Sequence, residues 1–272
     1  TLAAILSLKT YVSDSEFWAV TASRQLGEAG VSASIYVKFL FYGLLKPIYG
    51  LPLDNISHVL IARLEFACIS ALTAFVFYRV SKRVFSRDIP ALLLTLFLVS
   101  NTFFLSQSFR VRSDNLASLF ALLVTWITLV ASEKSDERWI GRWGLVALLN
   151  VLALVTTPKA VFFLLTGFVF ATALPFKALK HERKGLAVML GFVVPPFFIV
   201  SAFAFARLFP ELRWVERASL VAFDYFRDSF AGLGGTNSYL SESDFFYVLK
   251  FLAQNPVHDL LFLGSVAAWI VA

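Results

Sequence analysis

The chain has 272 residues, of which 58% are hydrophobic and only 15% are charged, and its mean hydropathy is +0.75. A soluble domain is typically about one quarter charged, so this composition excludes an ordinary water-soluble protein and indicates an integral membrane protein. The net charge of +6 does not indicate nucleic-acid binding, because the basic residues fall in short loops between apolar runs, where they set membrane topology. The single cysteine, Cys68, excludes a disulfide framework and a cysteine-based metal site.

Successive apolar runs predict an all-α, polytopic membrane fold with about eight transmembrane helices, since a helical span needs about 20 apolar residues. Two further segments, 16–28 and 35–49, are helix-like but too polar to span, and we expect them to be amphipathic helices at the membrane interface. Both ends of the chain lie inside apolar runs, so we interpret residues 1–272 as a single transmembrane domain from a longer protein. The expected spans are 1–12, 57–78, 89–109, 115–131, 143–157, 160–176, 186–208 and 248–272.

Basic residues in three short loops predict the orientation, because loops rich in Lys and Arg face the cytoplasm. The remaining segments, 13–56, 110–114, 156–159 and 209–247, are then extracytoplasmic, and 209–247 is the one long outer loop besides the first. We expect the plasma membrane of a bacterium, which is its inner membrane. The basic residues of the three loops are Arg79, Lys82, Arg83 and Arg87; Lys134, Arg138 and Arg142; and Lys177, Lys180, Arg183 and Lys184.

Two acids follow the first apolar run directly, in the stretch S-D-S-E-F-W. Asp14 and Glu16 are costly at this depth unless they face water, a cation or a reacting group, so one interpretation is functional. The other is an ordinary helix start, with Ser13 or Ser15 as the cap and an acid in the first turn, which suits the helix dipole. Both interpretations stay open at this point.

Cations gather in two of the other outer segments. The stretch S-F-R-V-R-S-D-N-L places Arg110, Arg112 and Asp114 at one outer turn, where Arg suits phosphate and the acid can hold a guanidinium in place. The stretch V-T-T-P-K-A-V-F-F places Lys159 in the first turn of a helix, with Thr157 as its cap. A cation there opposes the helix dipole, and a bound anion would relieve that conflict. For both stretches the alternative is a basic side chain that snorkels to the interface.

These three stretches resemble the acidic first outer loop, the R-x-D element and the T-x-K-a-x-f element of the C-type (GT-C) glycosyltransferases, which include protein O-mannosyltransferases and aminoarabinose transferases. Their order, spacing and side agree over nearly the whole chain, and the bacterial family 39-like members are the most similar group. The resemblance implies a catalytic carboxylate at Asp14, with Glu16 as the alternate, and phosphate contacts from Arg112 and Lys159. Arg110 is a further candidate for the phosphate and Asp114 for orienting it.

The implied activity is inverting transfer of a sugar from a polyprenyl-phosphate donor to an acceptor glycan, lipid or protein on the extracytoplasmic side. An acid is the general base, and the cations stabilise the departing lipid phosphate. No cofactor is expected, and no histidine spacing indicates a metal site, although a divalent metal between Asp14 and Glu16 stays open.

Two other functions compete with this one. Ser15 separates acids that are adjacent in many relatives, and G-V-S-A-S-I-Y-V-K-F lacks the Pro-Tyr and His-rich stretch often found there. Both departures favour a non-catalytic membrane subunit of a larger complex, built on the same fold. A transporter needs polar or broken helices at mid-membrane, for which Asn150 is the clear candidate, but a lone Asn in a span more often bonds a neighbouring helix.

Overall fold

The computed structural model describes residues 14–26, 38–133, 139–157, 159–174 and 181–206. Every regular element in this part of the chain is a helix, which confirms the all-α fold class. The expected spans 1–12 and 248–272 and the outer loop 209–247 lie outside the described residues. The helices are α2 (Asp14–Gln25), α4 (Phe39–Tyr49), α5 (Asn55–Phe85), α6 (Asp88–Ser100), α7 (Thr102–Ser108), α8 (Ser113–Glu133), α9 (Trp139–Thr156), α10 (Ala160–Ala173), α11 (His181–Val188), the π-helical segment η1 (Met189–Val193) and α12 (Val194–Ala206).

Four of the helical stretches are long and apolar enough to cross a membrane, namely Asn55–Phe85, Ser113–Glu133, Trp139–Thr156 and Arg183–Ser201. Large apolar side chains such as Leu64, Phe75, Leu148 and Val200 are exposed along them, as expected where lipid rather than water is the solvent. The structure therefore agrees with the composition that this is a membrane protein. Two shorter apolar helices, α6 and α10, occupy positions where the sequence predicts spans.

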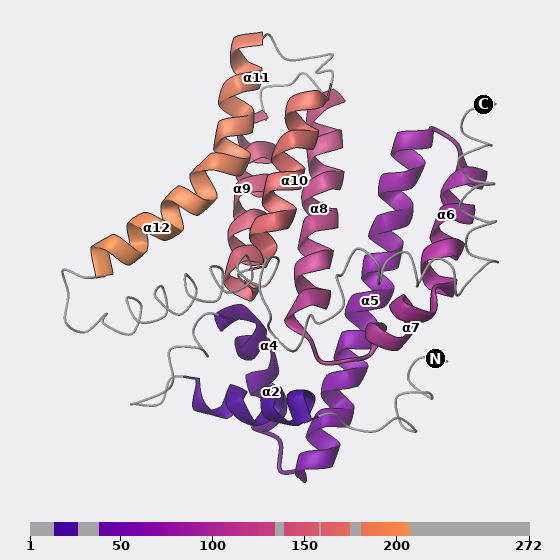
Figure 1. Cartoon of the computed structure of the whole chain (residues 1–272), viewed down its shortest axis with the longest axis vertical. Coiled ribbons are helices and arrows are strands. Elements are labelled where there is room, and N and C mark those ends of the chain that lie inside the picture. The colour runs from indigo at the N-terminus through magenta and orange to yellow at the C-terminus, as the bar shows by residue number, and fades with distance from the viewer. Residues whose placement is uncertain (1–13, 27–37, 134–138, 158, 175–180, 207–272) are drawn as a thin grey trace, which may run out of the picture.

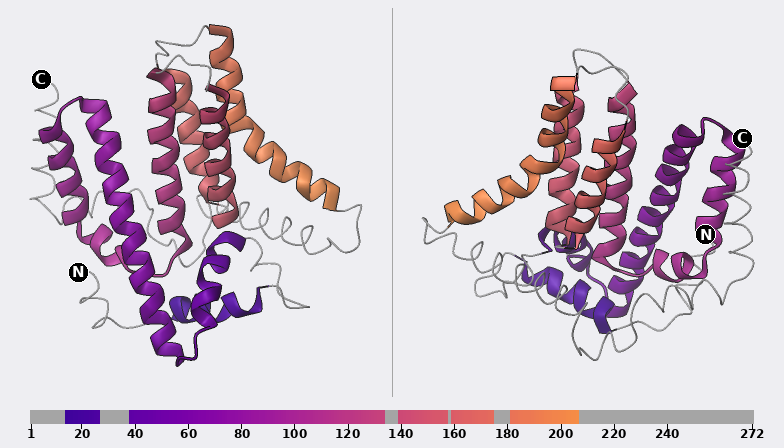
Figure 2. Two further views of the ribbon diagram at one scale, coloured as in Figure 1. Left: turned by 180° about the vertical axis from the view of Figure 1, so that it is seen from behind. Right: turned by 45° about the horizontal axis from the view of Figure 1, so that its top comes forward.

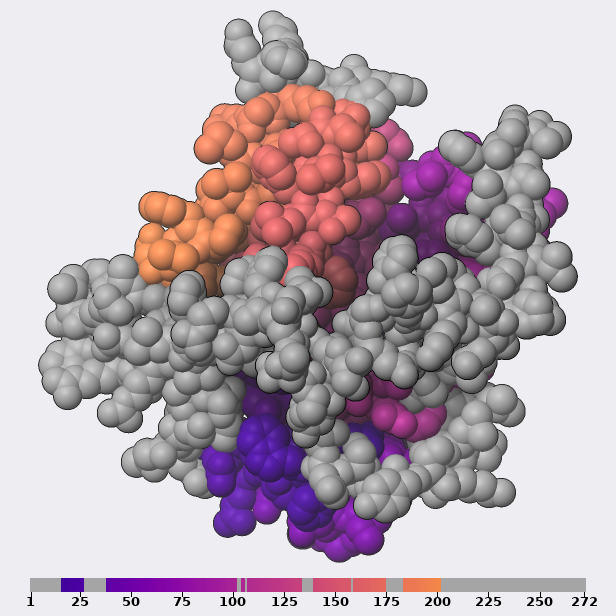
Figure 3. Space-filling view, viewed as in Figure 1, coloured from indigo at the N-terminus to yellow at the C-terminus, as the bar shows by residue number. Residues whose placement is uncertain are grey.

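The long helices run between two ends of the molecule, and α2 and α4 lie together at one of them (Figure 1). The start of α8, the end of α9 and the start of α10 reach the same end, whereas the α5 to α6 turn and α11 lie at the other (Figures 1 and 2). In the space-filling view the side chains of α2 occupy the lower end and those of α10 and α11 the upper end (Figure 3). The described parts of the segments expected to be extracytoplasmic thus lie at the same end of the molecule.

Helices α2 and α4 pack against one another and against α5. The Lys46 ammonium of α4 donates to the Leu26 carbonyl at 2.5 Å, and the Trp18 and Tyr42 rings meet edge to face with centroids 5.9 Å apart. Val20 and Leu45 are fully buried in a core that also includes residues of α5 and α8. The two short helices predicted at 16–28 and 35–49 are therefore present, packed as one layer across the end of α5.

The expected span 89–109 is divided into two helices, which corrects the prediction of a single one. Helix α6 ends at Ser100, and Asn101 adopts an extended backbone conformation with φ −65° and ψ 123°. The Asn101 side-chain oxygen then accepts from the Phe104 amide at 3.1 Å, which caps the start of α7. An Asn within an apolar run thus competes for the backbone and breaks the helix.

Asn150 bonds a neighbouring helix, as a lone Asn in a span is expected to do. Its Nδ2 donates to the Gly191 carbonyl at 2.9 Å, inside the π-helical segment η1. A π-turn disturbs the regular backbone bonding pattern, and Pro195 and Pro196 follow it after Val194, so α12 leans away from α9 in Figure 1. Asn150 therefore supports the packing of this bend and gives no support to a transport site.

The close approach of η1 to α9 predicts that Gly191→Ala destabilises the fold. A Cβ at position 191 would lie 2.9 Å from Trp143 Cε3 and from Val146 Cγ1, both on buried side chains. Overpacking of this kind typically costs about 1 to 3 kcal/mol, so we expect a lower midpoint of thermal unfolding in detergent. Gly144→Ala on α9 is the matched control, since its Cβ meets nothing within 4 Å. Equal midpoints for the two variants would contradict the packing argument.

Candidate functional site: a cationic cavity at the α2 end

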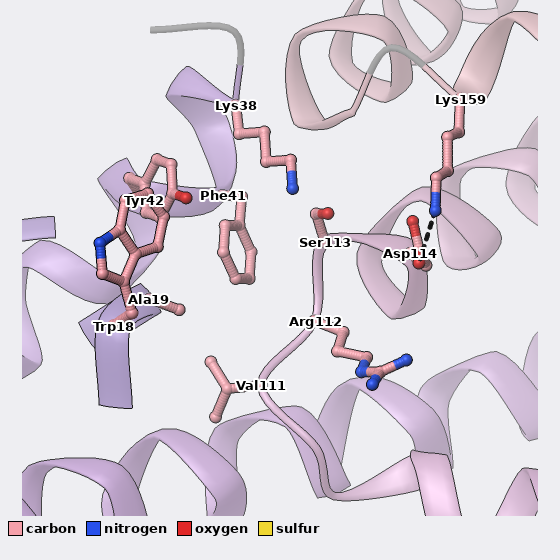
Figure 4. Close-up of a pocket in the computed structure, with 10 residues that line it drawn as sticks. All are labelled: Trp18, Ala19, Lys38, Phe41, Tyr42, Val111, Arg112, Ser113, Asp114 and Lys159. Carbon is pink, nitrogen blue, oxygen red and sulfur yellow. Dashed lines mark ion pairs between the residues drawn. The ribbon is translucent and has the colours of Figure 1, made fainter. Parts of the chain in front are cut away.

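A cavity of about 570 Å³ opens between α2, α4, the loop before α8 and the start of α10. One wall is aromatic, formed by Trp18, Phe41 and Tyr42 (Figure 4). The other walls hold four charged side chains, those of Lys38, Arg112, Asp114 and Lys159. These residues come from four separate parts of the sequence, so only the folded chain assembles the cavity.

The charges in the cavity are three cations against one carboxylate. Lys159 Nζ lies 3.8 Å from Asp114 Oδ2, and both side chains are about half exposed, at 48% and 46%. A pair at that distance, open to solvent, contributes little to stability. Arg112 is exposed and belongs to the cavity lining, and its guanidinium points away from the aromatic wall in Figure 4. The described lining is therefore net cationic and suits an anion.

Two helix N-termini also favour an anion in this cavity. Helix α8 begins at Ser113, whose side chain lines the cavity, and α10 begins directly after Lys159, which occupies the N-cap position. The N-terminal end of a helix carries a partial positive charge and free amide donors, both favourable to a phosphate or carboxylate. The Thr157 hydroxyl, predicted to cap α10, is buried and makes no hydrogen bond within the described part of the chain, so that cap is not formed.

The pKa of the Lys38 ammonium is affected by its surroundings in the cavity. Burial lowers the pKa of its ammonium below the ordinary value of 10.5, the Asp114 carboxylate acts in the opposite direction, and Lys159 adds to the lowering. Its Nζ points toward Ser113 and the Asp114 and Lys159 pair in Figure 4. A buried ammonium that faces another cation is stabilised when an anion binds between them.

Tyr42 gives the aromatic wall a neutral polar group. Burial raises the pKa of its phenol to about 12, so the hydroxyl keeps its proton at physiological pH. An aromatic face with a hydroxyl beside cations is the kind of mixed lining that small-molecule sites use.

Glu16 lies behind this cavity, in a buried ion pair. Its Oε2 is 2.7 Å from Arg63 Nη2 and its Oε1 is 3.0 Å from Arg63 Nε, with both side chains 1% exposed. The Val111 amide donates to the same Oε1 at 3.2 Å. Glu16 therefore joins α2, α5 and the loop that presents Arg112, and in the described structure it is not among the residues that line the cavity.

The sequence-predicted site residues thus separate into three groups. Arg112, Asp114 and Lys159 come together in one cavity, and Asp114 pairs there with Lys159 rather than with a guanidinium as expected. Glu16 is placed behind the loop, and Arg110 does not appear in the described lining. Asp14 is the first residue of α2, which agrees with an acid at a helix start, while its side chain lies outside the described residues.

Sequence reasoning missed Lys38 and Arg63. Lys38 lies in the stretch G-V-S-A-S-I-Y-V-K-F, and a lone Lys before an apolar helix gives no signal of a binding site. Arg63 was available as a charged residue within an apolar span, and such a residue needs a partner. That partner is Glu16, 47 positions away in the sequence.

No family model, curated protein or solved structure matches this chain. Within the described residues, no group of three or more His, Cys, Asp and Glu side chains is placed to hold a metal ion.

The buried ion pair predicts a large loss of stability when one partner is neutralised. Glu16→Gln would remove the carboxylate charge that bonds the buried Arg63 guanidinium twice, and breaking such a pair costs about 3 to 5 kcal/mol. We expect the midpoint of thermal unfolding in detergent to fall markedly. The matched control is Glu133→Gln, since Glu133 pairs with Arg83 at 2.5 Å but is 48% exposed. A Glu16→Gln protein as stable as the Glu133→Gln protein would contradict this account.

Proposed function

We propose that this chain is a glycosyltransferase of the GT-C type, which moves a sugar from a polyprenyl-phosphate donor to an acceptor at the extracytoplasmic face of the membrane. The proposal includes the finer topology expected from sequence, with about eight spans and the α2 end outside. The observation that supports it best is the convergence of Arg112, Lys159 and Lys38 on one cavity beside two helix N-termini. Arg112 and Lys159 are the residues to which the family resemblance assigns the phosphate.

The cations would bind the phosphate of the donor. Three cationic side chains against one carboxylate offset the charge of a phosphate group, and that charge grows as the bond to the sugar breaks. Donors and charges fixed before the reaction stabilise a developing negative charge better than mobile water does. The aromatic wall of Trp18, Phe41 and Tyr42 lies opposite and is suited to the apolar face of a sugar ring.

Asp14 is the better candidate for the general base. Residues four apart lie on the same face of a helix, so position 14 is on the face of Trp18, which lines the cavity. Residues two apart lie on different sides, and Glu16 is engaged by Arg63 and the Val111 amide. We therefore assign proton transfer to Asp14 and positioning of the cationic loop to Glu16.

In the proposed reaction Asp14 accepts the proton of the acceptor hydroxyl as its oxygen attacks the anomeric carbon of the sugar. The bond between that carbon and the phosphate oxygen breaks, and the electron pair leaves with the lipid phosphate. The attack comes from the side opposite the leaving group, so the configuration at the anomeric carbon is inverted. General-base catalysis of this kind contributes roughly 10²- to 10⁴-fold.

The assignment of Asp14 predicts that Asp14→Asn lowers sugar transfer by roughly 10²-fold or more without loss of expression. The measurement is transfer of labelled sugar from a polyprenyl-phosphate donor in reconstituted membranes. Asp54→Asn is the matched control at the same end of the molecule: Asp54 caps α5 by accepting from the Ile56 amide, and Asn also makes a good cap. Unchanged transfer by Asp14→Asn would exclude Asp14 as the base.

The cationic cavity predicts that Lys38→Gln weakens binding of polyprenyl phosphate by about tenfold, as expected for a lost charged hydrogen bond. Affinity of the unaltered protein should also fall as the pH rises through the Lys38 pKa, below 10.5, since deprotonation removes one cation. The Lys38→Gln variant should lack this step in an equilibrium titration over pH. Lys82→Gln at the opposite end is the control, because Lys82 is exposed and paired with Asp88. Equal affinities for the two variants would count against the site.

A further inference from the structure

A second cavity, of about 440 Å³, lies between α5, α6, α7 and α8. Its described lining has no Asp, Glu, Lys, Arg or His. It extends from Ser70, the central residue of α5, to Asn115 and Ser118 in the first two turns of α8, and both helices are long and apolar enough to span. The polar side chains that line it include Ser70, Thr73, Gln107, Ser108, Asn115 and Ser118.

Polar side chains on helices that cross a membrane are costly and are usually found where they face other protein groups, water or a ligand. Here they come from three helices and face one space, instead of being scattered along the spans. The rest of the lining is apolar and includes Phe77, Phe97 and Phe104. A volume of this size is typical of a small-molecule site and far exceeds that of a bare cation.

The hydroxyl groups have already used their hydrogens within the protein. Ser70 donates to the Ser108 carbonyl at 2.6 Å, Thr73 to the Ile69 carbonyl at 2.8 Å and Ser118 to the Asp114 carbonyl at 2.8 Å. A hydroxyl has one hydrogen and two lone pairs, so these groups are left as acceptors.

Asn115 also leaves a hydrogen-bond acceptor in the cavity. Its Nδ2 donates to the Gln107 carbonyl at 2.8 Å and to the Arg110 carbonyl at 3.0 Å, which uses both amide hydrogens. Both partners are carbonyl oxygens, so the orientation of the amide is settled and Oδ1 is the atom left to accept. The cavity lining also includes the amide side chains of Asn101 and Gln107; among the described residues it is rich in acceptors and has no charged side chain.

We propose that this second cavity binds an uncharged, hydroxyl-rich group, such as a glycosyl unit, whose hydroxyls donate to Asn115 Oδ1 and to the hydroxyl oxygens of Thr73 and Ser118. An anion would meet acceptors without a cation, and a cation would meet no carboxylate. A neutral polyol fits both conditions, and the phenylalanines suit its apolar face. The site is separate from the cationic cavity, since the two described linings share no residue, and the inference does not depend on the proposed transfer reaction.

The experiment is native mass spectrometry of the whole chain in a polyoxyethylene detergent, which has no sugar headgroup. The probes are monoglucosyl diacylglycerol, diacylglycerol with the same acyl chains, and methyl glucoside. We expect a glucosyl probe to bind at least tenfold more tightly than diacylglycerol. Binding of the lipid alone identifies a lipid-held polyol, and equal binding of methyl glucoside identifies a soluble one. Equal binding of the two lipids, or no binding of either glucosyl probe, would overturn the proposal.

Two variants test the location. Thr73→Val with Ser118→Ala removes two acceptors without breaking a bond between helices, and binding should weaken by about 30-fold or more. Leu122→Trp places a bulky side chain in the cavity while every polar lining residue is kept, and it should abolish binding. Thr125→Val is the matched control on α8, since Thr125 donates to its own helix at Ala121 and is not in the described lining. Wild-type affinity in either cavity variant would place the ligand elsewhere and refute the site.

Discussion

The buried ion pair between Glu16 and Arg63 is the interaction on which the cationic end of the molecule depends. A charged side chain within a membrane helix is expensive unless an opposite charge and hydrogen bonds compensate it. Arg63 meets that requirement with two bonds to one carboxylate, and the Val111 amide also donates to Oε1 of Glu16. One acid therefore holds a surface helix, a spanning helix and a loop in a single arrangement.

That arrangement separates the compensated ion pair from the cations of the cavity at one end of the protein. The compensated pair lies behind the loop before α8, and the cations Lys38, Arg112 and Lys159 lie in front of it. Because the pair is already neutral, the cavity keeps the positive field of the three cations and of two helix N-termini. An anion that enters meets charges that are already in place, so little free energy is spent on reorganising them. A phosphate-binding site requires charges of this kind.

The membrane architecture could be predicted in outline because it depends on composition and length. Apolar runs, capped by basic loops, identify spanning helices without knowledge of their neighbours, and the helices α5, α8 and α9 occupy the expected places. The division of 89–109 at Asn101 was missed, because a helix break within an apolar run depends on where one side chain finds its partner. The same holds for the π-segment at Met189–Val193, whose contacts lie on α9.

The sequence by itself determined the class of protein, the alternation of its helices between two ends, and the collection of Arg112, Asp114 and Lys159 at one of them, because these follow from periodicity and chain direction. Only the tertiary structure decided which groups face one another. It placed Glu16 against Arg63, brought Lys38 to the cavity and paired Asp114 with Lys159. Ion pairing depends on distances of a few ångströms between residues far apart in the chain, and no local pattern encodes those distances.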